Sequence, residues 1–336
     1  MIKAIIINDT SLNKHHGCEL LMNEIDRLCE KNKIKIVERC FNSSLNFGKK
    51  KIINSNFNLA LVNGEGSLHN NQQAAHNILD IVEMIKKNYK VPIILINSSI
   101  FNLNKKLISK FKFFDKIFVR DSESYKELIK YKIKSIVVPD LLFNYKIKKI
   151  SKKKYIIVTD AHQNHISKKL ISFAIKNKLT FLPIKKNIKI FFNRKINFLF
   201  IFLLILRKIK YLILTKYNET NIGYYYENSN KKFLEKILES EKILTGRFHF
   251  MVLCIILKIP FFALKSNTPK IERLFLDVGL NKKRIVKINK VNSFFKIKNI
   301  NYTKNEIKNI NKYILYANKQ TQKMFNLIKK TRNSKI

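Results

Sequence analysis

An arginine and a histidine stand two residues apart just before an apolar stretch of the chain. Residues 245–249 read Thr-Gly-Arg-Phe-His and lead into the apolar run 250–257. The pattern predicts a strand end, a tight turn at Gly246 and a buried helix that carries Arg247 and His249 in its first turn. Free backbone N–H groups and the helix dipole favour an anion there. We therefore predict an anion site; the alternative is that the arginine pairs with a carboxylate and the histidine is a hydrogen-bonded core residue.

A second loop that can carry chemistry follows the predicted strand 59–62. Residues 63–69 read Asn-Gly-Glu-Gly-Ser-Leu-His, in a chain that has only seven glycines. Glycines let the backbone approach a ligand, and open parallel sheets bind ligands at the carboxyl ends of their strands. The carboxylate and the imidazole can orient a hydroxyl or transfer a proton; the alternative is a glycine turn with both groups solvated. The residues that we place in a site are Gly64, Glu65, Gly66, Ser67 and His69.

Polar residues also follow three other predicted strands. Residues 13–19 read Asn-Lys-His-His-Gly-Cys-Glu after the first strand, which places His16 and Gly17 to contact a phosphate or a sugar. Arg120 ends a strand and is either a substrate ligand or the partner of an acidic neighbour. Asp140 also lies just beyond a strand, where its carboxylate either belongs to the site or caps a turn.

The charge of the chain points to anionic partners. Lys+Arg number 67 against 23 Asp+Glu, a net charge of +44, which favours nucleic acid, an anionic membrane face or phosphorylated substrates. The lysines are spread along the chain, and no nucleic-acid-binding motif is present, so nucleic acid is not expected as a specific partner. The four cysteines include no C-x-x-C pair and predict no metal site and no disulfide framework. A reduced, cytoplasmic setting follows.

A basic and apolar segment, residues 191–214, has two interpretations. Its longest apolar run, 196–206, is shorter than the roughly 20 residues that span a bilayer. The segment either packs in a core or between domains, or lies as a helix in the plane of an anionic membrane surface. In the second case the protein works at the inner face of the cell membrane.

These loops require a scaffold of parallel strands. Short apolar runs alternate with helical patterns, which predicts parallel sheets with helices on both faces. The lysine-rich stretch 146–154 separates two such series. We predict two Rossmann-like α/β domains, 1–148 and 154–300, and a C-terminal helical segment, 301–336, in which 304–330 forms one or two surface helices.

Taken in order, these motifs resemble the polysaccharide pyruvyl transferase family. The resemblance extends over roughly residues 1–280 and rests on the motifs at 16–19, 63–69, 120–122, 139–140, 246–249, 259–260 and 270–271. It departs from the family in the first loop, His-Gly-Cys-Glu where Asn-x-Gly-Asp is common, and at 64–66, Gly-Glu-Gly where Gly-Gly-Gly is usual. The fold that it implies is similar to the two-domain GT-B glycosyltransferases, with a cleft between the domains.

The resemblance also implies a reaction and roles for residues. Better known members transfer pyruvate from phosphoenolpyruvate to sugar hydroxyls as a ketal, and their Arg-x-His motif binds phosphoenolpyruvate and supplies the catalytic histidine. Carried over, His249 is the acid/base, and Arg247, Gly246 and Arg120 bind the donor. The acceptor sugar then lies in the first domain, near loop 63–69, and the reaction occurs in the cleft.

The implied partners are a saccharide or lipid-linked saccharide acceptor and phosphoenolpyruvate as co-substrate, with no cofactor and no metal. One alternative is a GT-B-like glycosyltransferase that uses a nucleotide sugar in capsule or lipopolysaccharide synthesis, because a nucleotide sugar also needs an anion site at a helix start. A second is a non-enzymatic binder of nucleic acid or membrane surfaces, suggested by the charge. Both stay open on the sequence.

Overall fold

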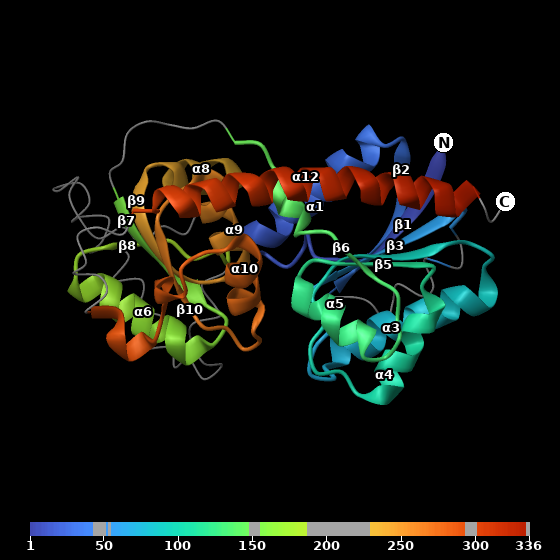
Figure 1. Ribbon diagram of the computed structural model, residues 1–336, viewed down its shortest axis with the longest axis horizontal. Coiled ribbons are helices and arrows are strands. Elements are labelled where there is room, and N and C mark those ends of the chain that lie inside the picture. Colours follow the sequence, from blue (N-terminus) through green and yellow to red (C-terminus); the bar gives the residue numbers. More distant parts are fainter. Residues whose placement is uncertain (43–51, 53–54, 148–154, 187–228, 293–300, 334–336) are drawn as a thin grey trace, which may run out of the picture. The chain divides into compact units, whose positions relative to one another are not determined.

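The computed structural model describes residues 1–42, 52, 55–147, 155–186, 229–292 and 301–333. Contacts divide the chain into two compact units (Figure 1). Unit 1 comprises Met1–Lys148, Thr268–Lys283 and Tyr302–Ile336, and unit 2 comprises Lys149–Asn267 and Arg284–Asn301. The sequence prediction placed 268–283 in the second domain and 301–336 in a segment of its own, whereas both return to unit 1. They do so because their side chains pack and hydrogen-bond there, as described below.

Unit 1 is built on a parallel sheet with the strand order β2-β1-β3-β4-β5-β6. The strands are β1 (Ile2–Asp9), β2 (Ile34–Phe41), β3 (Leu59–Glu65), β4 (Ile93–Ser98), β5 (Lys116–Val119) and β6 (Ile136–Val137). In the register of the central strands, Ile6 pairs with Leu61, and Leu61 pairs with Ile94. All residues of β3 and β4 are buried. Such continuous burial is typical of a parallel sheet that is covered on both faces.

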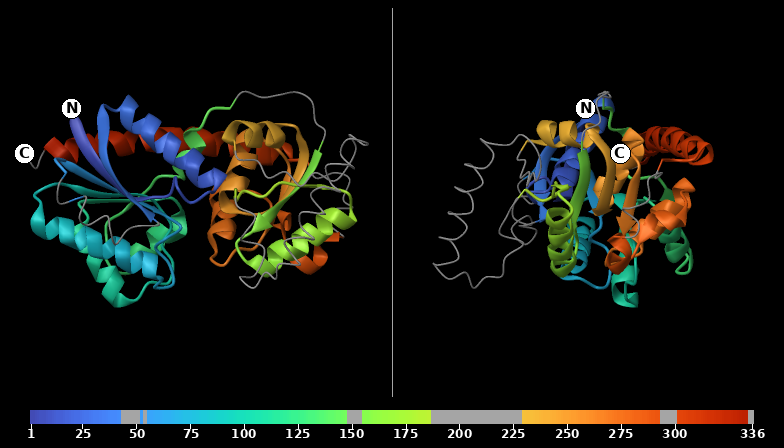
Figure 2. Two further views of the ribbon diagram at one scale, coloured as in Figure 1. Left: turned by 180° about the vertical axis from the view of Figure 1, so that it is seen from behind. Right: turned by 90° about the vertical axis from the view of Figure 1, so that its left-hand side faces the viewer.

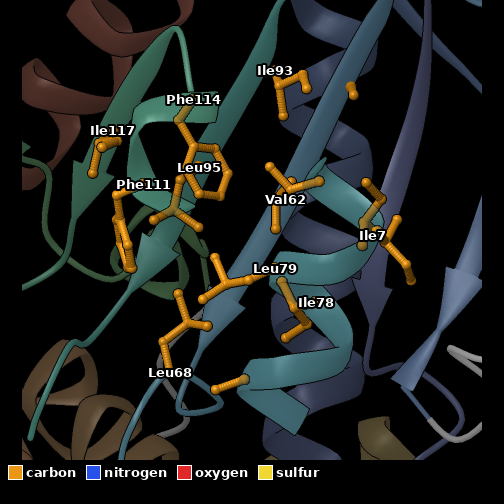
Figure 3. Close-up of a cluster of buried hydrophobic side chains, with 14 of the residues drawn as sticks. Ile7, Val62, Leu68, Ile78, Leu79, Ile93, Leu95, Phe111, Phe114 and Ile117 are labelled. Atoms are coloured by element: carbon orange, nitrogen blue, oxygen red, sulfur yellow. The ribbon is translucent and has the colours of Figure 1, made fainter. Parts of the chain in front are cut away.

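Helices cover both faces of this sheet. The helices of unit 1 are α1 (His16–Lys31), α3 (Gln73–Asn88), α4 (Lys105–Ser109), α5 (Ser122–Ile129), α10 (Lys270–Val278) and α12 (Lys304–Asn333), with 3₁₀ turns η2 (Lys110–Phe113) and η3 (Leu141–Asn144). Of these, α10 packs against α5 and α12. Figure 2 shows α1 on one face and α3 on the other. The core under α3 joins Ile78 and Leu79 of the helix to Ile7, Val62 and Leu95 of the strands (Figure 3).

The C-terminal segment forms one helix, α12, of 30 residues. Its buried stripe includes Ile310, Ala317 and Ile328, each 0% exposed. Asn144 of η3 donates a hydrogen bond to Thr321 Oγ1 at 3.0 Å. The apolar period that predicted surface helices therefore marks a helix whose inner face belongs to the core of unit 1.

Unit 2 has a second parallel sheet, with the order β11-β10-β9-β7-β8. Its strands are β7 (Tyr155–Ala161), β8 (Thr180–Phe181), β9 (Ser240–Gly246), β10 (Phe261–Leu264) and β11 (Ile285–Val286). Its helices are α6 (Asn164–Lys176), α8 (Asn230–Leu238) and α9 (Phe248–Leu257), followed by the short turns η5 (Lys282–Arg284), which runs from unit 1 into unit 2, and η6 (Ile288–Lys290). The prediction of two parallel-sheet α/β units is therefore confirmed.

The two sheets share one topology. In each, the first strand of the unit lies between the second and the third, as in β2-β1-β3 and β8-β7-β9. The connections leave β1 and β3, or β7 and β9, in opposite directions, and open sheets bind ligands beyond the carboxyl ends of such a pair. The topology therefore predicts one ligand edge in each unit.

The basic segment 191–214 lies outside the described residues, so both interpretations of it stay predictions. None of the helices that the structure describes is both long and apolar enough to cross a membrane. All four cysteines are buried, and none of them forms a disulfide.

Candidate active site

The ligand edge of unit 2 is shaped by Gly246, the last residue of β9. A Cβ atom at this position would lie 2.8 Å from the Cα of Ala161 in β7. The φ angle of Gly246 is not in the left-handed region. Its glycine is thus required by the close approach of the neighbouring strand. The connection is as tight as predicted, because Arg247 alone separates β9 from α9.

Arg247 follows this glycine and is the N-cap of α9, one residue before the first turn in which it was predicted. Its Nε donates to Asp160 Oδ2 at 2.7 Å, and Nη2 bonds the same oxygen. The Arg247 side chain is 9% exposed and that of Asp160 0%. Asp160 Oδ1 is also occupied, because it accepts from the Ile184 N–H at 2.8 Å. The carboxylate pairing that we gave as the alternative is present, and a role for Arg247 in donor binding stays a prediction.

His249 lies in the first turn of α9 and is 6% exposed. Its ring centroid is 5.6 Å from that of Phe248 in an edge-on contact. The Arg247 side chain makes no capping hydrogen bond to α9. A histidine is thus held at the positive end of a buried helix, as the sequence predicted, and its acid/base role stays a prediction.

The ligand edge of unit 1 begins with Gly64, which belongs to β3 and not to a loop. A Cβ atom here would lie 3.1 Å from the Cα of Ser98 in β4. Glu65 ends the strand with φ 41°, and its Oε1 accepts from Cys18 Sγ at 3.2 Å. Glu65 is 8% exposed. The solvated carboxylate that we gave as the alternative is therefore wrong. The glycine turn is present, closed by the Ser67 N–H, which donates to the Gly64 carbonyl at 2.9 Å.

The loop predicted at 13–19 is mostly the start of α1. His15 is the N-cap, and its Nδ1 accepts from the Cys18 N–H at 3.2 Å. His16 is 0% exposed, and Gly17 is buried in the first turn. This cap was not predicted, because histidine is not among the residues, Ser, Thr, Asp and Asn, that usually mark the start of a helix.

A small cavity in unit 1 brings together three of the predicted residues, Gly66, His69 and Arg120. Its free volume is about 10 Å³, close to the least that holds one water molecule. Its wall consists of Gly66, His69, Ser99, Phe101, Arg120, Thr268, Pro269, Lys270 and Arg273. Gly64, Glu65, Ser67, His16, Gly17 and Asp140 do not line it. We call it the anion cavity, for the charges described next.

Arg120 reaches the anion cavity from the end of β5 and is held on both sides. Its Nε donates to Ser99 Oγ at 2.7 Å, and its Nη1 donates to Asp140 Oδ2 at 3.0 Å. The Arg120 and Asp140 side chains are 2% and 1% exposed. Asp140 also caps η3, because its Oδ1 accepts from the Leu142 N–H at 3.0 Å. The acidic partner that we gave as one reading of Arg120 is present. Its role as a substrate ligand stays a prediction.

Helix α10 supplies two more cations to the same cavity. Arg273 Nη1 donates to Asp121 Oδ1 at 3.2 Å and to the Ile100 carbonyl at 3.0 Å. Lys270 is the first residue of α10, and Pro269 provides no side-chain cap. The positive end of the helix dipole therefore lies at the cavity wall. Sequence reasoning noted Lys270 only as part of a family motif and missed Arg273, because only the fold shows that this segment returns to unit 1.

His69 faces these cations as a neutral imidazole. It is 7% exposed, and its Nδ1 has no hydrogen-bond partner among the residues that the structure describes. Burial, together with the charges of Lys270 and Arg120, lowers the pKa of His69. Arg120, Lys270 and Arg273 place three cationic groups on the wall of the cavity. Their charges favour an anion beside an uncharged imidazole; that an anion binds there stays a prediction.

Two parallel-sheet α/β units of this kind define a fold shared with nucleotide-sugar enzymes. A UDP-GlcNAc 2-epimerase of Methanocaldococcus jannaschii matches with a TM-score of 0.52 at 14% identity, over 94% of this chain and 100% of the epimerase. A functionally uncharacterised protein of Klebsiella pneumoniae matches with a TM-score of 0.51 at 9% identity, over 85% and 92% of the two chains. At such identities the likeness shows the fold alone.

The sequence itself identifies the family. The model of the polysaccharide pyruvyl transferase family matches residues 15–268, so the chain belongs to that family, as the motifs predicted. The protein is accordingly an enzyme of the transferase class. No curated protein sequence matches the chain.

Proposed function

We propose that this enzyme transfers pyruvate from phosphoenolpyruvate to a sugar hydroxyl of a surface polysaccharide or of its lipid-linked precursor. The observation that carries the proposal is the anion cavity, in which Arg120 and Lys270 stand beside a neutral His69. Membership of the family supplies the reaction class. Phosphoenolpyruvate is a co-substrate with two anionic groups, and no metal or other cofactor is part of the proposal.

The cavity changes how the predicted residues are grouped. The loop of Gly66 and His69 was assigned to the acceptor and Arg120 to the donor, but all three line one cavity. A guanidinium and an ammonium favour an anion over a neutral sugar; hydrogen bonds to charged groups contribute about 1.5 to 3 kcal/mol each. We therefore add His69 and Lys270 to Arg120 as proposed donor ligands of unit 1. The role that the family resemblance gives to Arg247 of unit 2 stays a prediction.

In the proposed reaction His249 gives up one proton and takes one back. His249 in its acid form gives a proton to C3 of phosphoenolpyruvate, and C2 becomes cationic. A sugar hydroxyl bonds to C2 and returns its proton to the imidazole. The C2–O bond to phosphate then breaks, a second hydroxyl of the sugar bonds to C2, and inorganic phosphate takes up the last proton. The product is a pyruvate ketal.

A thermal-shift titration tests the donor. Phosphoenolpyruvate at about 100 times its Kd should stabilise the protein by about 2.7 kcal/mol. The shift should shrink in Lys270→Gln and persist in the matched control Lys105→Gln, an exposed lysine of α4. A shift with a nucleotide sugar and none with phosphoenolpyruvate would instead identify a GT-B-like glycosyltransferase. Phosphate release from phosphoenolpyruvate on addition of saccharide then tests the transfer itself.

We also propose that the reaction takes place in the cytoplasm, at the inner face of the cell membrane. The net charge of +44 supports contact with an anionic lipid surface. Flotation with vesicles tests this: binding to vesicles that contain anionic lipid, weakened by salt, is expected, and equal binding to neutral vesicles would contradict it.

A further inference from the structure

Unit 1 has a second, larger hollow that the proposed reaction does not use. Its free volume is about 440 Å³, and it is open to solvent. We call it the tyrosine groove, and the residues that carry the argument are Ser122, Asp277, Asn309, Lys312, Tyr313 and Tyr316. They come from the start of α5, the end of α10 and the middle of α12.

Two aromatic rings form one side of the tyrosine groove. The centroids of Tyr313 and Tyr316 are 6.2 Å apart, with their planes tilted by 43°. Tyr313 is fixed by an edge-on contact with Phe143 at 5.2 Å and is 7% exposed, whereas Tyr316 is 39% exposed. Burial raises the pKa of both tyrosines, so both hydroxyls stay protonated. The groove thus presents the exposed part of the Tyr316 ring, which is backed by the buried ring of Tyr313.

Hydrogen-bonding groups stand beside the rings. Asp277 accepts from Ser122 through both oxygens, at 3.0 Å from the backbone N–H and 2.5 Å from the hydroxyl. Asn309 Nδ2 donates to the Gly279 carbonyl at 3.0 Å, which leaves its amide oxygen to accept. Lys312 is exposed on α12. Carboxylate, amide and ammonium groups around aromatic rings suit a ligand with apolar faces and many hydroxyls, which is the chemistry of a saccharide.

The position of the groove connects it to the anion cavity. Both hollows share α10 as a wall, since Lys270 and Arg273 line the cavity while Asp277 lines the groove. They also flank one turn after β5, where Arg120 faces the cavity and Ser122 the groove. A chain in the groove therefore lies next to the proposed donor site along the carboxyl edge of the same sheet.

We propose that the tyrosine groove binds a saccharide segment of the acceptor. This rests on the proposed function, which supplies a saccharide as the acceptor. The exposed ring of Tyr316 would stack on a sugar ring, and Asp277 and Asn309 would accept hydrogen bonds from hydroxyls. The groove is a binding site apart from the reacting atoms, so its loss should weaken acceptor binding and leave donor binding unchanged.

The test uses labelled full-length protein on an array of defined oligosaccharides, with and without phosphoenolpyruvate, followed by calorimetric titration of the best binder. Tyr316→Ala should weaken binding at least about tenfold, which corresponds to 1.4 kcal/mol. Tyr316→Phe keeps the ring and should stay within about threefold of the wild type, an effect below 1 kcal/mol. Leu315→Ala is the matched control, since Leu315 is the neighbouring residue, is 70% exposed and does not line the groove.

Either of two results overturns the proposal: no oligosaccharide binds, or Tyr316→Ala binds as tightly as wild type. Binding of an extended peptide and of no saccharide would likewise overturn it. The phosphoenolpyruvate shift, measured on the same variants, keeps the two proposals apart. If phosphoenolpyruvate stabilises the protein and no oligosaccharide binds, only the groove proposal is refuted. If phosphoenolpyruvate gives no stabilisation and saccharide binding depends on Tyr316, only the donor proposal is refuted.

Discussion

At the scale of the residue, each unit has a glycine at or near the carboxyl end of a strand, where a neighbouring strand approaches closely. Gly64 near the end of β3 and Gly246 at the end of β9 each lie where a Cβ atom would collide with the adjacent strand, at Ser98 or Ala161. Each belongs to the strand beside the first strand of its unit, at the ligand edge. The glycines therefore allow adjacent strands to approach closely at the ligand edge, directly before the residues that we predict to be functional.

The proposed role of His249 leads to a kinetic prediction. His249→Ala should lower turnover about 10² to 10⁴-fold, because a placed acid/base contributes that much to a rate. Its folding should be intact. The matched control is His165→Ala, which removes an exposed histidine of the same unit. Turnover is measured as phosphate released from phosphoenolpyruvate in the presence of saccharide, and an unchanged rate would refute the assignment.

His69 should make the stability of the protein depend on pH. Its pKa is lowered in the folded state, so the unfolded chain binds more protons between the two pKa values. The resulting stability is present above the ordinary histidine pKa of about 6.5 and is lost as pH falls toward the folded value. His69→Gln should therefore reduce the loss of unfolding free energy on acidification, measured by urea denaturation on either side of that pKa. His76→Gln, a partly exposed histidine, is the control; an equal loss in wild type and His69→Gln would contradict the prediction.

At the scale of the element, the periodicity of the sequence predicted where strands and helices form. The strands at 4–7, 59–62 and 116–119 were found because parallel strands in a covered sheet are continuous apolar runs. The role of α10 could not be found in this way. Its amphipathic pattern predicts a helix, but only the hydrogen bonds of Arg273 and Asp277 to the turn after β5 show which unit it joins. The anion cavity depends on that long-range contact.

The same reasoning predicts that α12 is part of the core of unit 1. Met324 is 1% exposed on the buried stripe of the helix, whereas Leu315 is 70% exposed. Met324→Ala should lower the free energy of unfolding by about 2 to 5 kcal/mol, as buried Met to Ala changes do. Leu315→Ala should stay within about 0.5 kcal/mol of wild type. Chemical denaturation measures both, and equal effects would mean that α12 does not pack as described.

At the scale of the whole molecule, the chain divides into units that are not continuous segments. Unit 1 is completed only by residues that follow most of unit 2 in the sequence. The proposed donor cavity shares this property, because Gly66, His69 and Arg120 precede unit 2 while Lys270 and Arg273 follow its main segment. A linear division of the sequence, such as 1–148 and 154–300, separates groups that the fold joins.

The fragment 1–148, the first domain of the sequence prediction, should therefore fail to fold on its own. It lacks α10 and α12, whose buried side chains include Ile271, Phe275, Ile310 and Phe325, each 0% or 1% exposed. Removing these helices exposes the apolar surface that they cover, and burial of apolar surface contributes about 25 cal/mol per Å². The fragment should show no cooperative melt by circular dichroism and poor dispersion in its NMR spectrum. The same fragment joined through a flexible linker to 268–283 and 302–336 should recover both properties, because the missing helices are restored without unit 2. A cooperative melt of 1–148 alone would show that the sheet is stable without them, and that the late segments serve the site and not the fold.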